Sequence, residues 1–168
     1  MELTNFKYNQ KKLNKMATIF LLLGIAGLGF AYYKWFVDTS SYVVSMGKYG
    51  SIFIALLGFG AFTYMKLFGK KGDEIALSIG TNGITSNTTP IANAAELIEW
   101  RDLVDVNFNG NYLDIHVKDP QKYADRMKSF FVRDTYLKGM KGVIRISIAE
   151  VDGSPEEISR AIAKYLNL

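Results

Sequence analysis

The stretch ATIFLLLGIAGLGFAYY, residues 17–33, decides the fold class because it contains no charged residue. Extended to residues 16–37, it is long enough to cross a hydrocarbon layer of about 30 Å as a helix that rises about 1.5 Å per residue. Lys34 is the only charge in the extension. It lies near one end, where its long stem can reach the headgroups. The pattern predicts a transmembrane helix over about residues 16–37.

A second uncharged stretch, YGSIFIALLGFGAFTYM over residues 49–65, follows a short linker and extends to residue 68. Two such segments predict a helical hairpin within residues 16–71, with a short external loop. The alternatives are buried helices of a soluble core and, for the first stretch, a cleaved signal peptide. The length of the runs favours the membrane, and the lack of a good cleavage site favours a retained anchor.

Lysines set the orientation of the predicted hairpin. They cluster before the first span, in a basic segment over residues 1–15, and directly after the second span. Because positive charge accumulates on the cytoplasmic side, we expect a multi-pass protein with both termini in the cytoplasm. The flanking lysines are Lys11, Lys12, Lys15, Lys70 and Lys71.

Charge is unevenly divided along the chain. Residues 1–71 carry nine lysines and two acidic residues, a net charge of +7, whereas residues 72–168 carry eleven basic and fourteen acidic residues, a net charge of −3. The basic pI therefore belongs to the membrane flanks and does not indicate nucleic-acid binding.

Small residues recur within the two spans. Gly27 and Ala31 are four residues apart, as are Ser51 and Ala55, a spacing that lets helix backbones approach closely in lipid. Packing within the hairpin and homo-oligomerisation through these faces explain the pattern equally well. No Asp, Glu, Arg or His lies inside either span, which argues against a transporter, pump or channel.

Catalytic and metal-binding chemistry has little support in the sequence. The chain has no Cys and only one His, which excludes thiolate zinc sites, cysteine nucleophiles and multi-histidine metal sites within one chain. No G-x-S-x-G, P-loop or H-E-x-x-H motif occurs. We therefore expect no enzyme activity, no cofactor and no metal site.

The stretch DVNFNGNYLDIH, residues 105–116, has the alternating oxygen side chains of a calcium loop, with Gly110 at its turn. However, its twelfth position is His116 instead of a bidentate Glu, and its flanks are β-like. A type I′ turn at Asn109-Gly110 predicts a β-hairpin instead.

That hairpin register predicts a small polar cluster. Asp105 would lie directly opposite Asp114, with His116 diagonal to Asp105. Like charges across a strand pair are unfavourable unless His116, an Arg from elsewhere or solvent compensates them. Asp105, Asp114 and His116 are the candidate surface cluster of the C-terminal domain.

The remaining signals predict an α+β domain over residues 72–168. Residues 75–79 alternate and lead through an Asn-Gly turn into a further strand, and residues 143–148 form an isoleucine strand. Polar residues 88–90 and residues 133–142 read as loops. These signals are typical of a small barrel or sandwich.

Two helices are expected in this domain. Asp119-Pro120 opens the first, which runs to Arg133 with Tyr123, Met127 and Phe130 or Phe131 on its apolar face. A capping box of Ser154 and Glu157 opens the closing helix.

A family resemblance rests on the order of four short motifs. They are Asn82-Gly83-Ile84, Glu99-Trp100-Arg101-Asp102-Leu103, Asp119-Pro120, and Ser154-Pro155-Glu156-Glu157 before Ile158. Together with the two-helix anchor, they resemble small, uncharacterised bacterial inner-membrane proteins that carry a cytoplasmic pleckstrin-homology-like (PH-like) domain. The resemblance implies the bacterial inner membrane and an antiparallel PH-like barrel or sheet capped by a C-terminal helix. It implies no catalytic residues.

Two functions fit these expectations. One is a non-enzymatic, membrane-anchored binding or adaptor protein that presents a sheet edge, or the loops around residues 87–95 and 133–142, to a protein partner. The other is a membrane-resident immunity protein that neutralises a bacterial toxin acting at the inner membrane. The bilayer is the second expected partner. Phosphoinositide binding has little support because the domain has a net charge of −3 and its loops lack a cluster of basic residues.

Overall fold

The computed structural model describes residues 3–37 and 44–166. It divides into two compact units. One is a helical hairpin, Gln10–Lys71, and the other is an α+β unit formed by Met1–Asn9 together with Gly72–Leu168.

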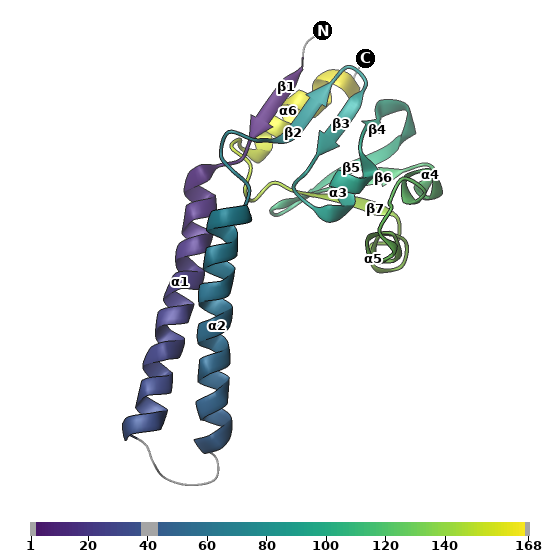
Figure 1. The fold of residues 1–168 in the computed structure, drawn as a ribbon. Helices are drawn as coiled ribbons and strands as arrows, with labels where there is room; N and C mark the ends of the chain where they lie inside the picture. The colour runs from purple at the N-terminus through teal and green to yellow at the C-terminus, as the bar shows by residue number, and fades with distance from the viewer. Residues whose placement is uncertain (1–2, 38–43, 167–168) are drawn as a thin grey trace. The chain divides into compact units, whose positions relative to one another are not determined.

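The hairpin consists of two long antiparallel helices (Figure 1). Helix α1 (Gln10–Tyr32) ends in the π-helical turn η1 (Tyr33–Val37), and α2 (Val44–Phe68) packs along α1. Both helices are long and apolar enough to cross a membrane. A Cβ atom at Gly27 would lie 2.7 Å from the backbone nitrogen of Ala55, so small residues set the close approach of the helices.

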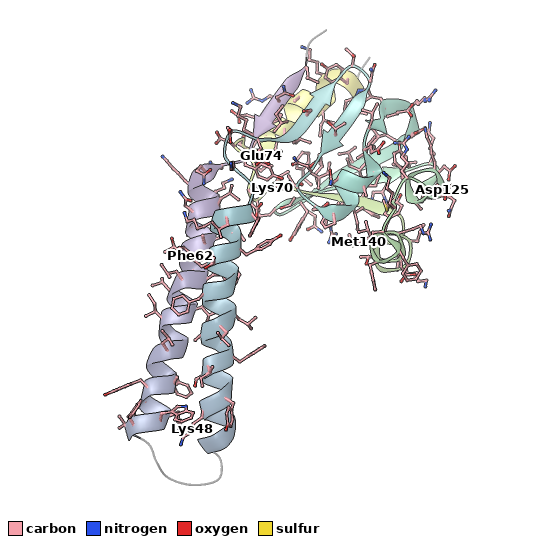
Figure 2. All side chains as sticks on the ribbon, in the orientation of Figure 1. Lys48, Phe62, Lys70, Glu74, Asp125 and Met140 are labelled. Carbon is pink, nitrogen blue, oxygen red and sulfur yellow. The ribbon has the colours of Figure 1, made fainter. Side chains whose placement is uncertain are left out.

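Large apolar side chains point outward from the hairpin (Figure 2). In each helix only 17% of the most apolar window is buried, which is the reverse of what a core helix of a soluble protein shows. At the end near η1, the Lys48 ammonium lies 5.2 Å from the centre of the Trp35 ring. The apolar side chains more than half exposed include Ile19, Leu22, Ile25, Leu28, Phe53, Leu56 and Leu57.

A strand precedes the hairpin in the chain. Strand β1 (Thr4–Lys7) pairs antiparallel with β2 (Ile75–Gly80), from Thr4 opposite Ile79 to Lys7 opposite Ile75. The sequence predicted only a basic terminal segment here and missed this strand. The whole hairpin is therefore inserted between two neighbouring strands of one sheet.

The first sheet has the strand order β1–β2–β3–β4. Its last strands are β3 (Gly83–Ser86) and β4 (Ile98–Glu99), and helix α6 (Pro155–Leu166) lies against β2 (Figure 1). The predicted capping box is confirmed, because Ser154 N donates to Glu157 Oε2 and Glu157 N donates to Ser154 Oγ. Fully buried core residues of this region are Leu77, Ile79, Ile84, Ile98 and Ile158.

The short 3₁₀ turn η2 (Trp100–Asp102) leads from the first sheet into the second. The second sheet has the order β5–β6–β7, with β5 (Leu103–Asn109), β6 (Tyr112–Val117) and β7 (Val143–Ser147). Within the described residues these are two separate antiparallel sheets, and they do not close into the predicted barrel. The coarser prediction of an α+β domain with two apolar helices is confirmed.

The predicted β-hairpin is present as β5 and β6, but its register differs from the expectation. The turn is centred on Gly110 and Asn111, so Asn109 pairs with Tyr112. Gly110 has φ of +59° and Asn111 has no positive φ, as in a type II′ turn. Residues 105–109 therefore face partners two positions further along β6 than predicted, which keeps the inward face apolar.

The predicted helix from Asp119 to Arg133 is broken into shorter pieces. Helix α4 (Pro120–Ala124) ends early, and α5 (Phe130–Asp134) continues into the π-helical turn η3 (Thr135–Gly139). The break follows from Arg126, whose guanidinium donates to the carbonyl oxygens of Ala95 and Leu97 and holds the chain between the two helices.

Two further details of this region differ from the expectation. The expected loop after Thr88 contains the short helix α3 (Pro90–Ala95), capped by the Thr89 hydroxyl. One of Phe130 and Phe131 was expected on the apolar helix face, but both are exposed.

Candidate functional site

The outward face of the second sheet carries the residues of the predicted cluster, but in a different arrangement. Asp105 faces His116, and Asp114 lies between Asn107 on β5 and Arg145 on β7. The predicted contact between Asp105 and Asp114 is wrong because of the register described above. A bulge at Val104 also turns this side chain to the exterior, where it is 64% exposed.

Arg145 compensates the charge of Asp114. Its Nε and Nη2 atoms donate to Oδ1 and Oδ2 of Asp114 at 2.6 and 2.8 Å. These charge-assisted hydrogen bonds hold the pKa of Asp114 below its usual value. The guanidinium also lies 5.1 Å from the centre of the Tyr112 ring. An arginine from elsewhere was one of the predicted compensations, and the pair leaves Asp114 committed to a structural contact.

Asp105 accepts hydrogen bonds from residues of its own strand. Its Oδ1 accepts the backbone N–H of Val106 at 2.8 Å, and its Oδ2 accepts the side-chain amide of Asn107 at 2.5 Å. Together with the bulge at Val104, this satisfied N–H makes the edge of β5 a poor template for an added strand. The opposite edge, on β7, is covered by Thr88 and Thr89, whose hydroxyls bond to its backbone. Neither edge of this sheet is a good docking site.

The five lysines predicted at the membrane flanks all lie at the open end of the helical hairpin, where α1 begins and α2 ends. We call this end the base of the hairpin. Lys11, Lys12 and Lys15 are exposed in the first turns of α1, and Lys70 and Lys71 are exposed after α2. The same end of the hairpin is tied by Lys66, which donates to Asn14 Oδ1 at 3.1 Å.

The sequence did not anticipate a charged network between η2 and α4. Lys122 Nζ lies 3.0 Å from Glu99 Oε1 and 2.5 Å from Asp102 Oδ2. The hydroxyl of Tyr123, a fully buried residue, donates to Asp102 Oδ2 at 2.8 Å. Hydrogen bonds from Lys122 are the main reason that the pKa values of both carboxyls lie below the usual range.

This network ties β4 and η2 to α4 and offers little acid–base chemistry. Its carboxylates are ionised and paired at neutral pH, so they are poor general acids. Next to it, Trp100 Nε1 donates to the carbonyl of Gly80 at 2.7 Å, and its ring stacks on Tyr165 at 5.5 Å. The signal available in the sequence is the motif Glu99-Trp100-Arg101-Asp102, which is also one of the motifs of the family resemblance.

The strongest candidate for a binding site is an apolar groove of about 300 Å³ between α3, α5 and η3. It joins the two segments that the sequence nominated as partner loops, residues 87–95 and 133–142. Met140, labelled in Figure 2, forms part of its wall. The lining residues are Thr89, Pro90, Ile91, Phe131, Val132, Thr135, Met140 and Arg145.

A larger hollow of about 420 Å³ lies over the β2–β3 turn. Its walls include Gly80, Thr81, Asn82 and Gly83, so small side chains and backbone form much of it. Leu3 and Leu97 are its large apolar side chains, whereas the groove at α5 has five apolar positions, and we therefore favour that groove.

Neither a metal site nor a known relative adds to this picture. Within residues 3–37 and 44–166, no group of three or more His, Cys, Asp or Glu side chains is placed to hold a metal ion. No family model, no curated protein and no solved structure matches the chain.

Proposed function

We propose that the chain is a non-enzymatic adaptor of the bacterial inner membrane, which is anchored by two transmembrane helices and presents a cytoplasmic domain to a protein partner. The observation that carries the proposal is the apolar groove between α3, α5 and η3. Its apolar walls, with Thr89, Thr135 and Arg145 as the polar positions, suit a short apolar segment of a partner protein.

The exposure of the hairpin supports the membrane anchor. Its outward side chains are large and apolar over the length of both helices. Such a surface is unfavourable in water and favourable in hydrocarbon, where helices satisfy all their backbone hydrogen bonds internally.

The insertion of the hairpin between β1 and β2 supports placing both termini on one side of the membrane. Lys7 and Ile75 are paired neighbours, so the chain leaves the sheet and returns to it at adjacent positions. Only an even number of crossings fits this connection. The exposed lysines at the base of the hairpin favour the cytoplasmic side.

A PH-like arrangement of the domain is part of the proposal. Two antiparallel sheets joined by η2, with a capped C-terminal helix against one of them, support it. The charged residues also favour binding over catalysis, because Asp114, Asp102 and Glu99 are each neutralised by a basic partner.

Site-specific photocrosslinking in native membranes tests the groove. A photoreactive residue at Thr135, on the exposed rim, is expected to capture a discrete protein, whereas the same residue at exposed Ser159 on α6 is the control. Met140→Asp should abolish capture from Thr135 because it places a charge in the apolar wall. Equal capture from the two positions, or capture that survives Met140→Asp, would argue against the groove.

The anchor is tested independently. The absence of native cysteine allows single-cysteine labelling in intact cells. An impermeant thiol reagent is expected to label Ser40→Cys in the linker and to leave Ser159→Cys unlabelled until the membrane is opened. The opposite labelling pattern would show that the proposed orientation is reversed. Release of the chain from membranes by alkaline carbonate would contradict the proposed transmembrane anchor.

A further inference from the structure

The tip of α5 exposes two aromatic rings to solvent. Phe130 is 63% exposed and Phe131 is 80% exposed, and their ring centres lie 5.9 Å apart. The inward face of this segment is formed by half-buried Val132 and fully buried Tyr136, which are four residues apart. The two phenylalanines are therefore held outward by the helical register.

The same region concentrates positive charge. Residues 126–145 contain six basic residues and one acidic residue, a net charge of +5. The rest of residues 72–168 contains five basic and thirteen acidic residues, a net charge of −8. The net charge of −3 for the whole domain, which had counted against phosphoinositide binding, hides this local excess of positive charge.

Four of these six basic residues are exposed, and one of the four, Lys138, is paired with an acidic side chain. Lys128, Arg133 and Lys141 are exposed, whereas Arg126 and Arg145 are engaged inside the domain. Lys138 forms an exposed ion pair with Asp134 at 2.6 Å. Exposed aromatic rings beside lysine and arginine are the composition of segments that lie in the membrane interface.

We propose that the tip of α5 is a second membrane contact, in which Phe130 and Phe131 insert into the interface of an anionic bilayer and Lys128, Arg133 and Lys141 bind lipid headgroups. The inference rests on the proposed anchor. The link from α2 to the sheet is only a few residues long, from Gly69 to Glu74, so the domain stays close to the bilayer surface.

Charge and shape favour lipid over an acidic protein segment as the occupant. Both rings are largely exposed on a short helix, and of the two only Phe131 also lines the groove. A protruding apolar pair suits insertion between lipids better than it suits capture of a peptide. Anionic headgroups supply the complementary charge, and each basic residue near such a surface strengthens binding about fivefold.

The full chain, reconstituted in lipid nanodiscs, tests this contact. Ser129→Cys beside the rings and Ser159→Cys on α6 are each labelled with an environment-sensitive dye, in a chain that has no other cysteine. Nanodiscs of phosphatidylcholine with phosphatidylserine carry a lipid-bound quencher. We expect strong quenching at Ser129 and little at Ser159, with the Ser129 signal reduced in pure phosphatidylcholine or at high salt.

Variants separate the two parts of the contact. Phe130→Ser with Phe131→Ser should abolish quenching at Ser129, and both positions are exposed, so the domain should stay folded. Lys128→Gln with Lys141→Gln should shift the lipid dependence to higher phosphatidylserine content, whereas Arg160→Gln on α6 should not.

The outcomes distinguish the tip from the anchor. If the chain co-elutes with the nanodiscs and Ser129 is quenched no more than Ser159, the tip contact is wrong and the anchor stands. If the chain does not co-elute, the anchor and the inference both fail. If Ser129 is unquenched in nanodiscs and is crosslinked to a protein in native membranes, the tip is a protein-docking site and the lipid proposal is wrong.

Discussion

Asp114 on β6 and Arg145 on β7 lie directly opposite one another, and the guanidinium donates to both carboxylate oxygens. The pair lies on the outward face of its sheet, yet Asp114 is only 8% exposed. A carboxylate held in this way lowers the free energy of the folded domain only while it is ionised.

Asp114→Asn should therefore destabilise the α+β unit by about 1–3 kcal/mol, because Arg145 loses its charged acceptor. The measurement is urea unfolding followed by Trp100 fluorescence in a Trp35→Phe background. Asp105→Asn, an exposed change on the neighbouring strand, should cost less than about 0.5 kcal/mol. Equal losses at the two positions would contradict the assignment of the pair.

The contribution of Asp114 should also depend on pH. Its pKa in the folded domain is lowered, so its stabilisation is complete above the unfolded value of about 3.9 and is lost as the pH falls through the folded value. The difference between the wild-type chain and Asp114→Asn should therefore be constant near neutrality and shrink below about pH 4. A difference that grows on acidification would reverse the sign of this linkage.

Tyr8 offers a second pH-dependent measurement, at the alkaline end. Its side chain is buried, and its hydroxyl donates to the backbone oxygen and to Oδ1 of Asn87 at 3.0 and 2.6 Å. Burial, followed by the charges of Glu150 and Glu74, raises its pKa to about 12. A raised pKa means that the stabilisation is present below about pH 10 and is lost as the pH rises toward 12.

Tyr8→Phe removes these hydrogen bonds and keeps the ring. It should cost about 1–3 kcal/mol at neutral pH, since the carbonyl and amide oxygens of Asn87 lose their donor. It should also reduce the loss of stability between about pH 10 and 12 relative to the wild-type chain. Unfolding in denaturant at several pH values measures both effects. An unchanged alkaline loss would assign that loss to other tyrosines.

The glycines of α1 differ in what surrounds them. A Cβ at Gly27 would lie 2.7 Å from the backbone nitrogen of Ala55, whereas a Cβ at Gly29 would meet no atom within 4 Å. Gly27→Leu should separate the two helices at a cost of about 1–3 kcal/mol, and Gly29→Leu should be neutral or stabilising. Thermal unfolding in detergent, followed by Trp35 fluorescence in a Trp100→Phe background, compares them. Equal effects would place the helix contact elsewhere.

Sequence patterns predicted the local elements that depend on one short signal. The capping box at Ser154, the two apolar helices and the inward isoleucines of β7 follow from the chemistry of a few neighbouring residues. The β-hairpin of β5 and β6 was also predicted, but its register was not, because Asn109-Gly110 and Gly110-Asn111 both suit a tight turn. Asn111 is also held by a long-range contact, because its carbonyl accepts the N–H of Ile148.

The features that the sequence missed depend on distant partners. β1 has only one apolar residue, Phe6, with Tyr8 directly after it, and its partner β2 follows the whole helical hairpin in the chain. The break after Ala124 depends on Arg126 reaching the carbonyls of Ala95 and Leu97. The apolar groove depends on α3 and α5 meeting across about forty residues of chain, so only its two flanking segments could be named in advance.

The insertion of the hairpin makes a prediction about the autonomy of the domain. Residues 72–168 alone lack β1 and Tyr8, which leaves one edge of β2 unpaired and the Tyr8 site empty. Loss of a buried aromatic side chain alone costs about 1.5–3 kcal/mol, and the lost strand hydrogen bonds add to this. We expect this fragment to unfold at much lower denaturant than the same fragment joined through a short Gly/Ser linker to residues 1–9.

A peptide of residues 1–9 provides the decisive comparison. Because β1 pairs with β2 as an edge strand, the peptide should bind the fragment 72–168 by strand addition and raise its unfolding midpoint in a concentration-dependent way. The same peptide with Tyr8→Ala should fail, since it lacks the side chain that reaches Asn87. Equal stability of the fragment with and without the peptide would show that β1 is dispensable and that the domain begins after the hairpin.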